Sequence, residues 1–303
     1  MNYLITGATG LIGKKLVMKL TNNSNNTVTV LTRSVNKAAQ LFSKVHCISA
    51  LDLALIEKQD VIINLAGEAI VDKRWTTTQK DIICQSRWQL TEQLSQLITQ
   101  AATPPSVFIS GSAIGIYGRQ QKQDIDEEFV DFYPEFSHQV CQRWEELALK
   151  AQSNDTRVAL LRTGIVLDKD GGALKKMLLP FKLGLGGRIA NGQQFMSWIH
   201  IDDMVNAIDY IVKNKGLSWA INMTAPYPQT NNQFSQMLAK TLARPCLFPV
   251  PKFILKLMLG EMAELVLYGQ HVIPKKLLAH GFKFQYPDLT KALEHILNSA
   301  NEQ

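Results

Sequence analysis

Three glycines near the start of the chain have the spacing that lets a backbone hold a phosphate group. Gly7, Gly10 and Gly13 directly follow the apolar run 2–6, and an amphipathic helical pattern begins after them. The first glycine permits a tight turn, the second lets the backbone approach a pyrophosphate, and the third lets helix and strand pack closely. The start of the helix adds free N–H groups and the positive end of its dipole. Strand, loop and helix in this order predict a dinucleotide site rather than a strand–turn–helix without a ligand.

The end of the second predicted strand, 27–31, indicates which dinucleotide binds. It runs into Thr32, Arg33 and Ser34, and no carboxylate is present. An acidic side chain here ordinarily binds the ribose 2′-hydroxyl of NAD, whereas an arginine can pair with the 2′-phosphate of NADP. We therefore predict NADP as the cofactor. The competing interpretation is that Arg33 is a solvated surface residue.

The elements that must position these residues follow from the alternation of short apolar runs with helical patterns. This alternation is typical of a parallel sheet with helices on both faces. The predicted strands are 2–6, 27–31, 45–48, 60–67, 106–110 and 158–162, and the long helices among them are 77–102 and 137–151. From about residue 164 the loops lengthen and helices dominate, at 203–213, 232–242, 252–267 and 289–297. We predict a doubly wound α/β NADP-binding domain over 1–165, with a sheet that later segments complete, and a smaller, mostly helical substrate lobe with a C-terminal helical extension over 166–303.

The composition excludes several classes of protein. The chain has 303 residues and a net charge of +6, but no run of basic residues that would mark a nucleic-acid-binding arm. Its four cysteines are widely separated, which argues against a disulfide framework and a metal site. No signal peptide and no apolar run long enough to span a membrane are present. We expect a cytoplasmic protein with reduced thiols, a small-molecule substrate, no nucleic-acid partner and no membrane partner.

Several segments resemble the extended short-chain dehydrogenase/reductase superfamily, the class of sugar-nucleotide epimerases and dehydratases. The matching segments are 7–13, 64–67, 110–118 and 198–203. Further segments are similar to its YfcH-type branch of epimerase-family proteins, which carry an additional C-terminal domain; these are 64–68, 74–76, 86–88, 161–164, 180–187, 197–200, 269–274 and 281–284. The resemblance covers essentially the whole chain and implies a Rossmann fold and NADP-linked chemistry. The reaction of the branch does not follow from it.

The resemblance also implies which residues hold the cofactor. The phosphate loop, the adenosine-phosphate end and the loop under the riboses correspond to Gly7, Thr9, Gly10, Leu11, Ile12 and Gly13, to Thr32 and Arg33, and to Leu65, Ala66 and Gly67. Arg87 stands where the wider superfamily has an asparagine that faces the active site. It could reach a cofactor or substrate oxygen, or form a salt bridge on the helix surface.

The catalytic pattern of the superfamily is incomplete in this chain. Its reductases resemble one another in a serine, a tyrosine that transfers a proton, and a lysine that lowers the tyrosine pKa. Ser112 occupies the serine position, although it could instead be a turn residue that caps a helix. Ser137 and Cys141 stand where tyrosine and lysine are expected. Neither can do the usual task, because serine is a far weaker acid and a neutral thiol supplies no positive field.

Three interpretations of this departure remain open. Tyr117 could supply the proton, although a wall of the substrate pocket is the favoured role for it. His138 or Cys141 could do so, since imidazole titrates near neutral pH; a buried apolar packing role is favoured for Cys141. Finally, no proton transfer of the usual kind need occur.

The first two interpretations predict an NADP-dependent oxidoreductase or epimerase-like enzyme that transfers hydride to or from a small molecule, with Ser112 and Tyr117 as catalytic residues. The third predicts an NADP(H)-binding regulator or scaffold. Helices 77–102 and 137–151 could form a homodimer, as is usual in the superfamily. For His200 we expect structural hydrogen bonds within the turn 198–203.

Overall fold

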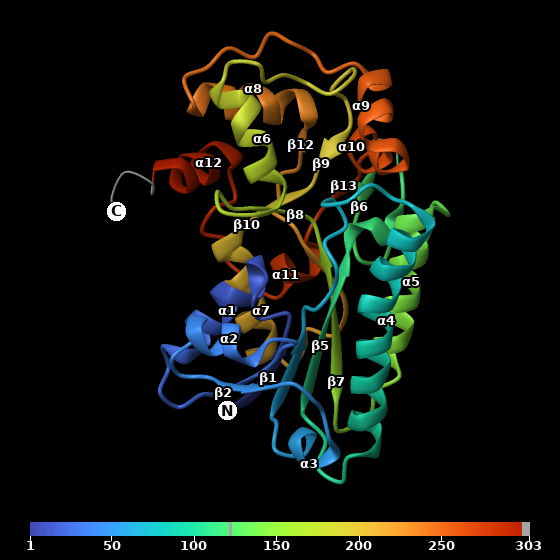
Figure 1. Cartoon of the computed structure of the whole chain (residues 1–303), viewed down its shortest axis with the longest axis vertical. Coiled ribbons are helices and arrows are strands. Elements are labelled where there is room, and N and C mark those ends of the chain that lie inside the picture. The colour runs from blue at the N-terminus through green and yellow to red at the C-terminus, as the bar shows by residue number, and fades with distance from the viewer. Residues whose placement is uncertain (121–122, 299–303) are drawn as a thin grey trace.

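The centre of the molecule is a seven-stranded sheet in the order β11–β7–β5–β4–β1–β2–β3, shown in Figure 1. Every strand in it pairs in parallel with its neighbours. This is a computed structural model, and it describes residues 1–120 and 123–298. The strands of the sheet are β1 (Asn2–Thr6), β2 (Thr27–Leu31), β3 (His46–Ile48), β4 (Val61–Asn64), β5 (Val107–Ala113), β7 (Arg157–Thr163) and β11 (Trp219–Met223).

The order of the strands locates the ligand-binding edge. From β1 the chain moves outward through β2 and β3, and then returns to place β4 on the other side of β1. This reversal leaves a crevice at the carboxyl ends of β1 and β4, where doubly wound sheets bind their ligands. The doubly wound Rossmann fold with a mostly helical C-terminal region, predicted from the alternating pattern, is confirmed.

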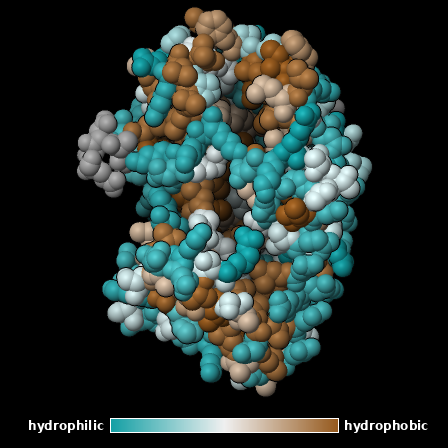
Figure 2. Space-filling view, viewed as in Figure 1, coloured by the Kyte–Doolittle hydropathy of each residue, from teal (hydrophilic) through white to brown (hydrophobic). Residues whose placement is uncertain are grey.

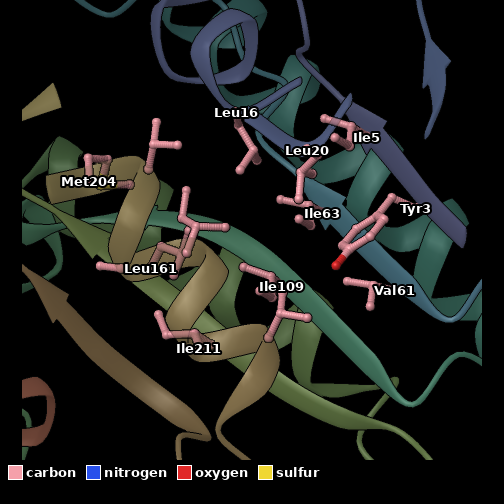
Figure 3. Packing of buried hydrophobic residues seen from close by; sticks show 14 of the residues in the cluster. Tyr3, Ile5, Leu16, Leu20, Val61, Ile63, Ile109, Leu161, Met204 and Ile211 are labelled. Carbon is pink, nitrogen blue, oxygen red and sulfur yellow. The ribbon is translucent and has the colours of Figure 1, made fainter. Parts of the chain in front are cut away.

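Helices cover one face of the sheet with the apolar stripes that their sequences predict. Leu16 and Leu20 of α1 (Leu11–Thr21) and Ile211 of α7 (Ile201–Lys213) pack in one cluster with Ile5 and Ile109 of the strands. Figure 3 shows these side chains meeting between helix and sheet. Burial of such a side chain contributes about 1.5–3 kcal/mol, so this cluster anchors the helix whose start carries the phosphate loop.

The other face is covered by two long helices, α4 (Thr77–Gln100) and α5 (Phe136–Leu149), which lie side by side in Figure 1. Leu94 of α4 and Ala148 of α5 pack on Leu4, Ile62 and Phe108. These three strand residues alternate with the ones that face α1, as the two-residue period of a strand requires. Thr76 caps α4 by accepting the N–H of Gln79, which sets where this helix begins.

Shorter elements complete the chain. The helices are α2 (Val35–Leu41), α3 (Leu53–Ile56), α6 (Gly172–Lys182), α8 (Asn231–Thr241), α9 (Lys252–Leu259), α10 (Glu264–Leu267), α11 (Lys275–Ala279) and α12 (Leu289–Asn298), with 3₁₀ turns η1 (Ile114–Tyr117) and η2 (Gly260–Ala263). The small strand pairs are β8 (Ile165–Leu167) with β10 (Trp198–His200), β9 (Phe195–Met196) with β12 (Gln229–Thr230), and β6 (Asp124–Ile125) with β13 (His271–Val272).

The lobe lies beyond the carboxyl ends of the strands and has a separate core. Trp198, Phe234 and Leu293 pack there between α6, α8 and α12. Two expectations need correction. The helix predicted over 203–213 is α7, which packs on α1 and the sheet rather than in the lobe. The helix predicted over 252–267 is interrupted at Gly260, whose φ of +61° lies outside the helical region.

The boundary at residue 165 stays a prediction. Two elements after this boundary return to the sheet, because α7 packs on it and β11 forms its edge strand. Among the described residues, none of the helices combines the length and apolar character that crossing a bilayer demands.

Candidate active site

The loop between β1 and α1 has the shape of a phosphate cradle, because its glycines have no room for a side chain. A Cβ atom on Gly7, whose φ is +68°, would lie 2.5 Å from the backbone of Leu65. A Cβ atom on Gly13 would lie 2.3 Å from the carbonyl oxygen of Gly7. Gly10 is less crowded, at 3.2 Å from the same oxygen, and it is the N-terminal cap of α1. The first turn of α1 therefore presents its N–H groups at the open edge of the sheet.

A chain of buried hydrogen bonds holds the neighbouring loop, Leu65–Gly67, against this cradle. Thr6 donates its hydroxyl to Asn64 (2.6 Å) and accepts the N–H of Ala66 (3.3 Å). Asn64 in turn donates to the hydroxyl of Thr91 on α4 (2.8 Å). The end of β4 is thus fixed by side chains from two other elements, as a surface for a bound ribose requires.

Arg33 lies exposed directly beyond β2. The hydroxyl of Thr32 accepts the N–H of Ser34 at 3.2 Å, which shapes the turn. The pKa of the Glu68 carboxyl is lowered, mainly by its hydrogen bond from Lys73 and also by the charge of Arg33. Arg33 thus follows the carboxyl end of β2, the edge of the sheet at which the phosphate loop also lies. This position is compatible with a phosphate on the adenosine ribose.

Arg87 reaches the crevice from α4, but its contacts differ from both expectations. Its guanidinium donates to the carbonyl oxygens of Ile83 and Glu68, each at 2.9 Å, and stacks 5.2 Å from the ring of Trp144. It lies under Gly67, where a Cβ atom would be 3.0 Å away. Burial lowers its pKa. Arg87 thus supports the loop after β4 instead of forming a surface salt bridge, and its contact with a cofactor stays a prediction.

Ser112 belongs to a buried polar row that crosses three strands. It pairs in register with Arg162 of β7, which pairs with Asn222 of β11, so the three side chains share one face. Glu145 of α5 covers that face. The hydroxyl of Ser112 donates to Oε1 of Glu145 (2.6 Å), and Arg162 binds both oxygens of the same carboxylate (2.9 and 2.8 Å). The Ser112 proton is therefore directed into the protein, away from any substrate.

Tyr117, in the turn after β5, continues this row. Its hydroxyl donates to Oδ1 of Asn222 (2.7 Å) and accepts from Arg162 (3.1 Å). The side chain is fully buried, which argues against the favoured role as a pocket wall, and that role stays a prediction. Burial raises its pKa to about 12, although Arg162 opposes the shift. A catalytic role for Tyr117 stays a prediction, and this burial argues against it.

The tyrosine and lysine of the superfamily are replaced by Ser137 and Cys141. Both lie on α5, which packs beside Ser112 of β5. Ser137 donates to the carboxylate of Glu135 (2.8 Å), and Nδ1 of His138 lies 2.5 Å from the carbonyl oxygen of Ile116. Cys141 is buried; this burial and the charge of Glu145 raise its pKa to about 12. The Cys141 thiol therefore stays protonated at neutral pH.

Comparison with known proteins agrees with this geometry. Residues 3–222 match the model of the NAD dependent epimerase/dehydratase family, and residues 250–296 match a domain of unknown function, DUF1731. The chain is 38% identical over 298 residues to "Epimerase family protein SH2119" of Staphylococcus haemolyticus, which covers 98% of this chain and 99% of that protein. It is 39% identical over 306 residues to a chloroplastic SDR39U1 homolog of Arabidopsis thaliana, at 98% and 87% coverage. The chain belongs to the NAD-dependent epimerase/dehydratase family.

Solved structures of two epimerase-family proteins are similar to this chain over nearly its whole length. Human epimerase family protein SDR39U1, solved with NADPH, is similar with a TM-score of 0.88 and 31% identity, over 98% of this chain and 99% of that one. A UDP-glucuronic acid 4-epimerase from Bacillus cereus, solved with UDP-glucuronic acid and NAD, has a TM-score of 0.77 at 18% identity, over 99% and 100% of the two chains. The second likeness concerns the fold alone. The resemblance stated from the sequence is confirmed, and the chain is an epimerase-family NAD(P)-binding protein.

Sequence reasoning missed two residues of the site in this family member, Glu145 and Arg162. The sequence does contain an indication for Arg162, because it is a charged residue inside the apolar strand 157–163. Such a residue requires a buried partner. Glu145 follows Cys141 by four residues, one helical turn further along α5. Which carboxylate meets Arg162 depends on how α5 lies on the sheet, and no local pattern indicates it.

A second polar cluster joins α7 to the C-terminal region. Nδ1 of His200 accepts the N–H of Asp202 (3.0 Å), so the ring proton lies on Nε2, which faces Nδ1 of His295 at 3.1 Å. Burial lowers the pKa of His200 to about 4. With both nitrogens engaged, the ring offers no lone pair to a metal ion, although His200, Asp202 and His295 lie close together. The structural role predicted for His200 agrees with these contacts.

Proposed function

We propose that this protein binds NADP(H) and catalyses hydride transfer to or from a small molecule in the crevice between the sheet and the lobe. The observation that carries the proposal is the crowded glycine loop at the start of α1, together with Arg33 in place of an acid after β2. The human relative solved with NADPH supports the same cofactor. When bound, NADPH would supply a hydride from its nicotinamide C4 to an electrophilic carbon.

The residues of this chain have separate tasks in the proposed reaction. The N–H groups at the start of α1 neutralise the pyrophosphate, and Arg33 pairs with the 2′-phosphate. Leu65, Ala66 and Gly67 form the surface under the riboses, which Arg87 keeps in place. Ser112 presents lone pairs to the substrate, because its proton is held by Glu145. The site therefore suits a substrate group that donates a hydrogen bond, such as a hydroxyl.

Replacement of Arg33 tests the cofactor. Arg33→Ala should weaken NADPH binding about 10- to 100-fold, the value of a lost charge-assisted pair, and leave NADH binding unchanged. Isothermal titration with both cofactors measures this, and Arg143→Ala, an exposed arginine on α5, is the matched control. Equal losses for both cofactors, or no loss, would contradict the assignment.

The second candidate function is an NADP(H)-binding regulator without turnover. The observation that favours it is the closed row of Ser112, Glu145, Arg162 and Tyr117, in which the hydroxyl groups are already bonded within the protein. Loss of NADPH absorbance with a panel of carbonyl compounds and nucleotide sugars distinguishes the two. Tight NADPH binding without oxidation across the panel would favour the regulator.

We further propose that the protein works in the cytoplasm. The four thiols are all unpaired, which suits a reducing compartment. The homodimer through α4 and α5 stays a prediction, and sedimentation of the purified protein measures it.

A further inference from the structure

The tip of the lobe exposes an unusual number of large hydrophobic side chains. In α9, Phe253 and Leu257 are 70% and 76% exposed, and they stand one helical turn apart on the same side. We call the whole exposed set the lobe tip; its members are Leu179, Leu183, Leu185, Leu247, Phe248, Phe253, Leu257 and Met258. Figure 2 shows hydrophobic residues gathered at this upper end, over α6 and over α9.

Three segments distant in sequence carry the lobe tip, and contacts between their loops hold them together. Arg244 donates its Nε to the carbonyl oxygen of Lys182 (2.9 Å), which ties the loop before α9 to the end of α6. A Cβ atom on Gly187 would collide with the backbone of Phe248, so these two loops run in direct contact. Val250 then pairs with Arg188 and Ala190 through the backbone just before α9 begins. The exposed apolar residues therefore lie on segments that are fixed to one another by these contacts.

The segments that carry the lobe tip are basic, although Asp72 forms an ion pair with Lys176 (2.7 Å) and Glu261 follows directly after them. The segments 171–201 and 225–260 contain no aspartate or glutamate. They contain eight basic residues, all of them exposed: Lys175, Lys176, Lys182, Arg188, Lys240, Arg244, Lys252 and Lys256. Since the whole chain carries +6, the remainder of the molecule is slightly acidic. The excess positive charge of the protein is thus concentrated beside its largest group of exposed apolar side chains.

We propose that the lobe tip docks on the surface of an anionic lipid bilayer. Apolar side chains that insert at the boundary of headgroups and acyl chains, with lysines beside them, are the recognition chemistry of such surfaces. In α9, Lys252 and Lys256 are four residues apart, as are Phe253 and Leu257. The basic pair and the apolar pair therefore form two adjacent stripes along the helix. Contact of this kind is peripheral and agrees with the absence of a membrane-spanning helix among the described residues.

The same charge distribution disfavours a second copy of this chain as the occupant. Two lobe tips placed face to face would bring Lys252 and Lys256 of one copy toward those of the other, with no acidic partner from either of the two segments. The expectation of no membrane partner came from the lack of a long apolar run, and it does not bear on a peripheral contact.

Flotation of the whole protein with lipid vesicles tests the proposal. Vesicles of phosphatidylcholine with phosphatidylglycerol should carry the protein upward at low salt, and vesicles of phosphatidylcholine alone should not. Lys252→Gln with Lys256→Gln should weaken partitioning about thirtyfold. Phe253→Ser with Leu257→Ser should weaken it at least about tenfold. High salt should also reduce it, because exposed charges are screened.

Matched variants far from the lobe tip serve as controls. Lys44→Gln with Lys58→Gln removes two exposed lysines from the sheet domain, and Met18→Ser with Leu41→Ser removes two exposed apolar side chains from α1 and α2. Both should float like the native protein. A cooperative thermal unfolding transition without added cofactor reports that every variant is folded, and this readout does not depend on the proposed function. No flotation with anionic vesicles, or equal flotation with neutral ones, would overturn the proposal. A dimer that Phe253→Ser with Leu257→Ser abolishes would do so as well, by assigning the surface to a second copy.

Discussion

The phosphate loop and the Ser112 row lie at the same edge of one sheet, yet they are built from different parts of the chain. The loop is made of backbone, and its glycines matter through the atoms they lack. The row is made of side chains from β5, α5, β7 and β11, each of which satisfies another. In this protein the phosphate loop follows the family pattern, whereas the Ser112 row departs from it. A cofactor site can therefore be retained while the chemistry beside it is rebuilt.

The largest effect should come from breaking the row at its carboxylate. Glu145→Ala leaves the guanidinium of Arg162 buried and unpaired, and we expect a loss of about 3–5 kcal/mol in the free energy of unfolding. Denaturant titration measures it. Glu146→Ala, next along α5 but exposed, should change stability by less than about 0.5 kcal/mol. A small loss for Glu145→Ala would mean that the row is not a structural unit.

Breaking the loop should affect binding. A Cβ atom on Gly13 has no room beside Gly7, so Gly13→Ala should weaken NADPH binding about a hundredfold by displacing the start of α1. Gly10→Ala, where the contact is 3.2 Å, should cause a clearly smaller loss. Titration of NADPH into both variants makes the comparison. If the order were reversed, the backbone account of the loop would fail.

The raised pKa of Tyr117 predicts a loss of stability at alkaline pH. The folded value is about 12, whereas the phenol of an unfolded chain ionises near 10. Its contribution is complete below pH 10 and declines as the pH rises toward 12, amounting to a loss of about 1.4 kcal/mol at pH 11. Unfolding at pH 9 and pH 11 measures this, and Tyr117→Phe should lose less stability between the two pH values than the native protein by that amount. Identical losses in both proteins would place Tyr117 in contact with water.

The smallest effect should come from Ser112. Ser112→Ala removes one hydrogen bond to a carboxylate that keeps Arg162, and we expect it to lower the free energy of unfolding by about 1 kcal/mol. NADPH affinity should be unchanged, because the loop and the row are independent devices. A marked loss of NADPH affinity would show that the phosphate loop and the Ser112 row are coupled.

Much of the fold could be predicted because its signals are local. The apolar runs of β1, β2, β5 and β7 and the punctuation around them predicted their strands to within a few residues. The late helices were harder, because Gly260 breaks a pattern that stays apolar on both sides. The place of α7 was missed because its periodicity is the same whether it covers the sheet or the lobe.

Local sequence was enough to predict the glycine turn, the helix that follows it and the arginine after the second strand. These depend on neighbours along the chain, because a missing Cβ acts on the backbone around it. Three other features follow only from packing: Glu145 meets Arg162, Tyr117 is enclosed, and the loops after α6 and before α9 lie in contact. Such meetings depend on the strand register and on how α5, α6 and α9 pack, and packing joins residues that no local pattern connects.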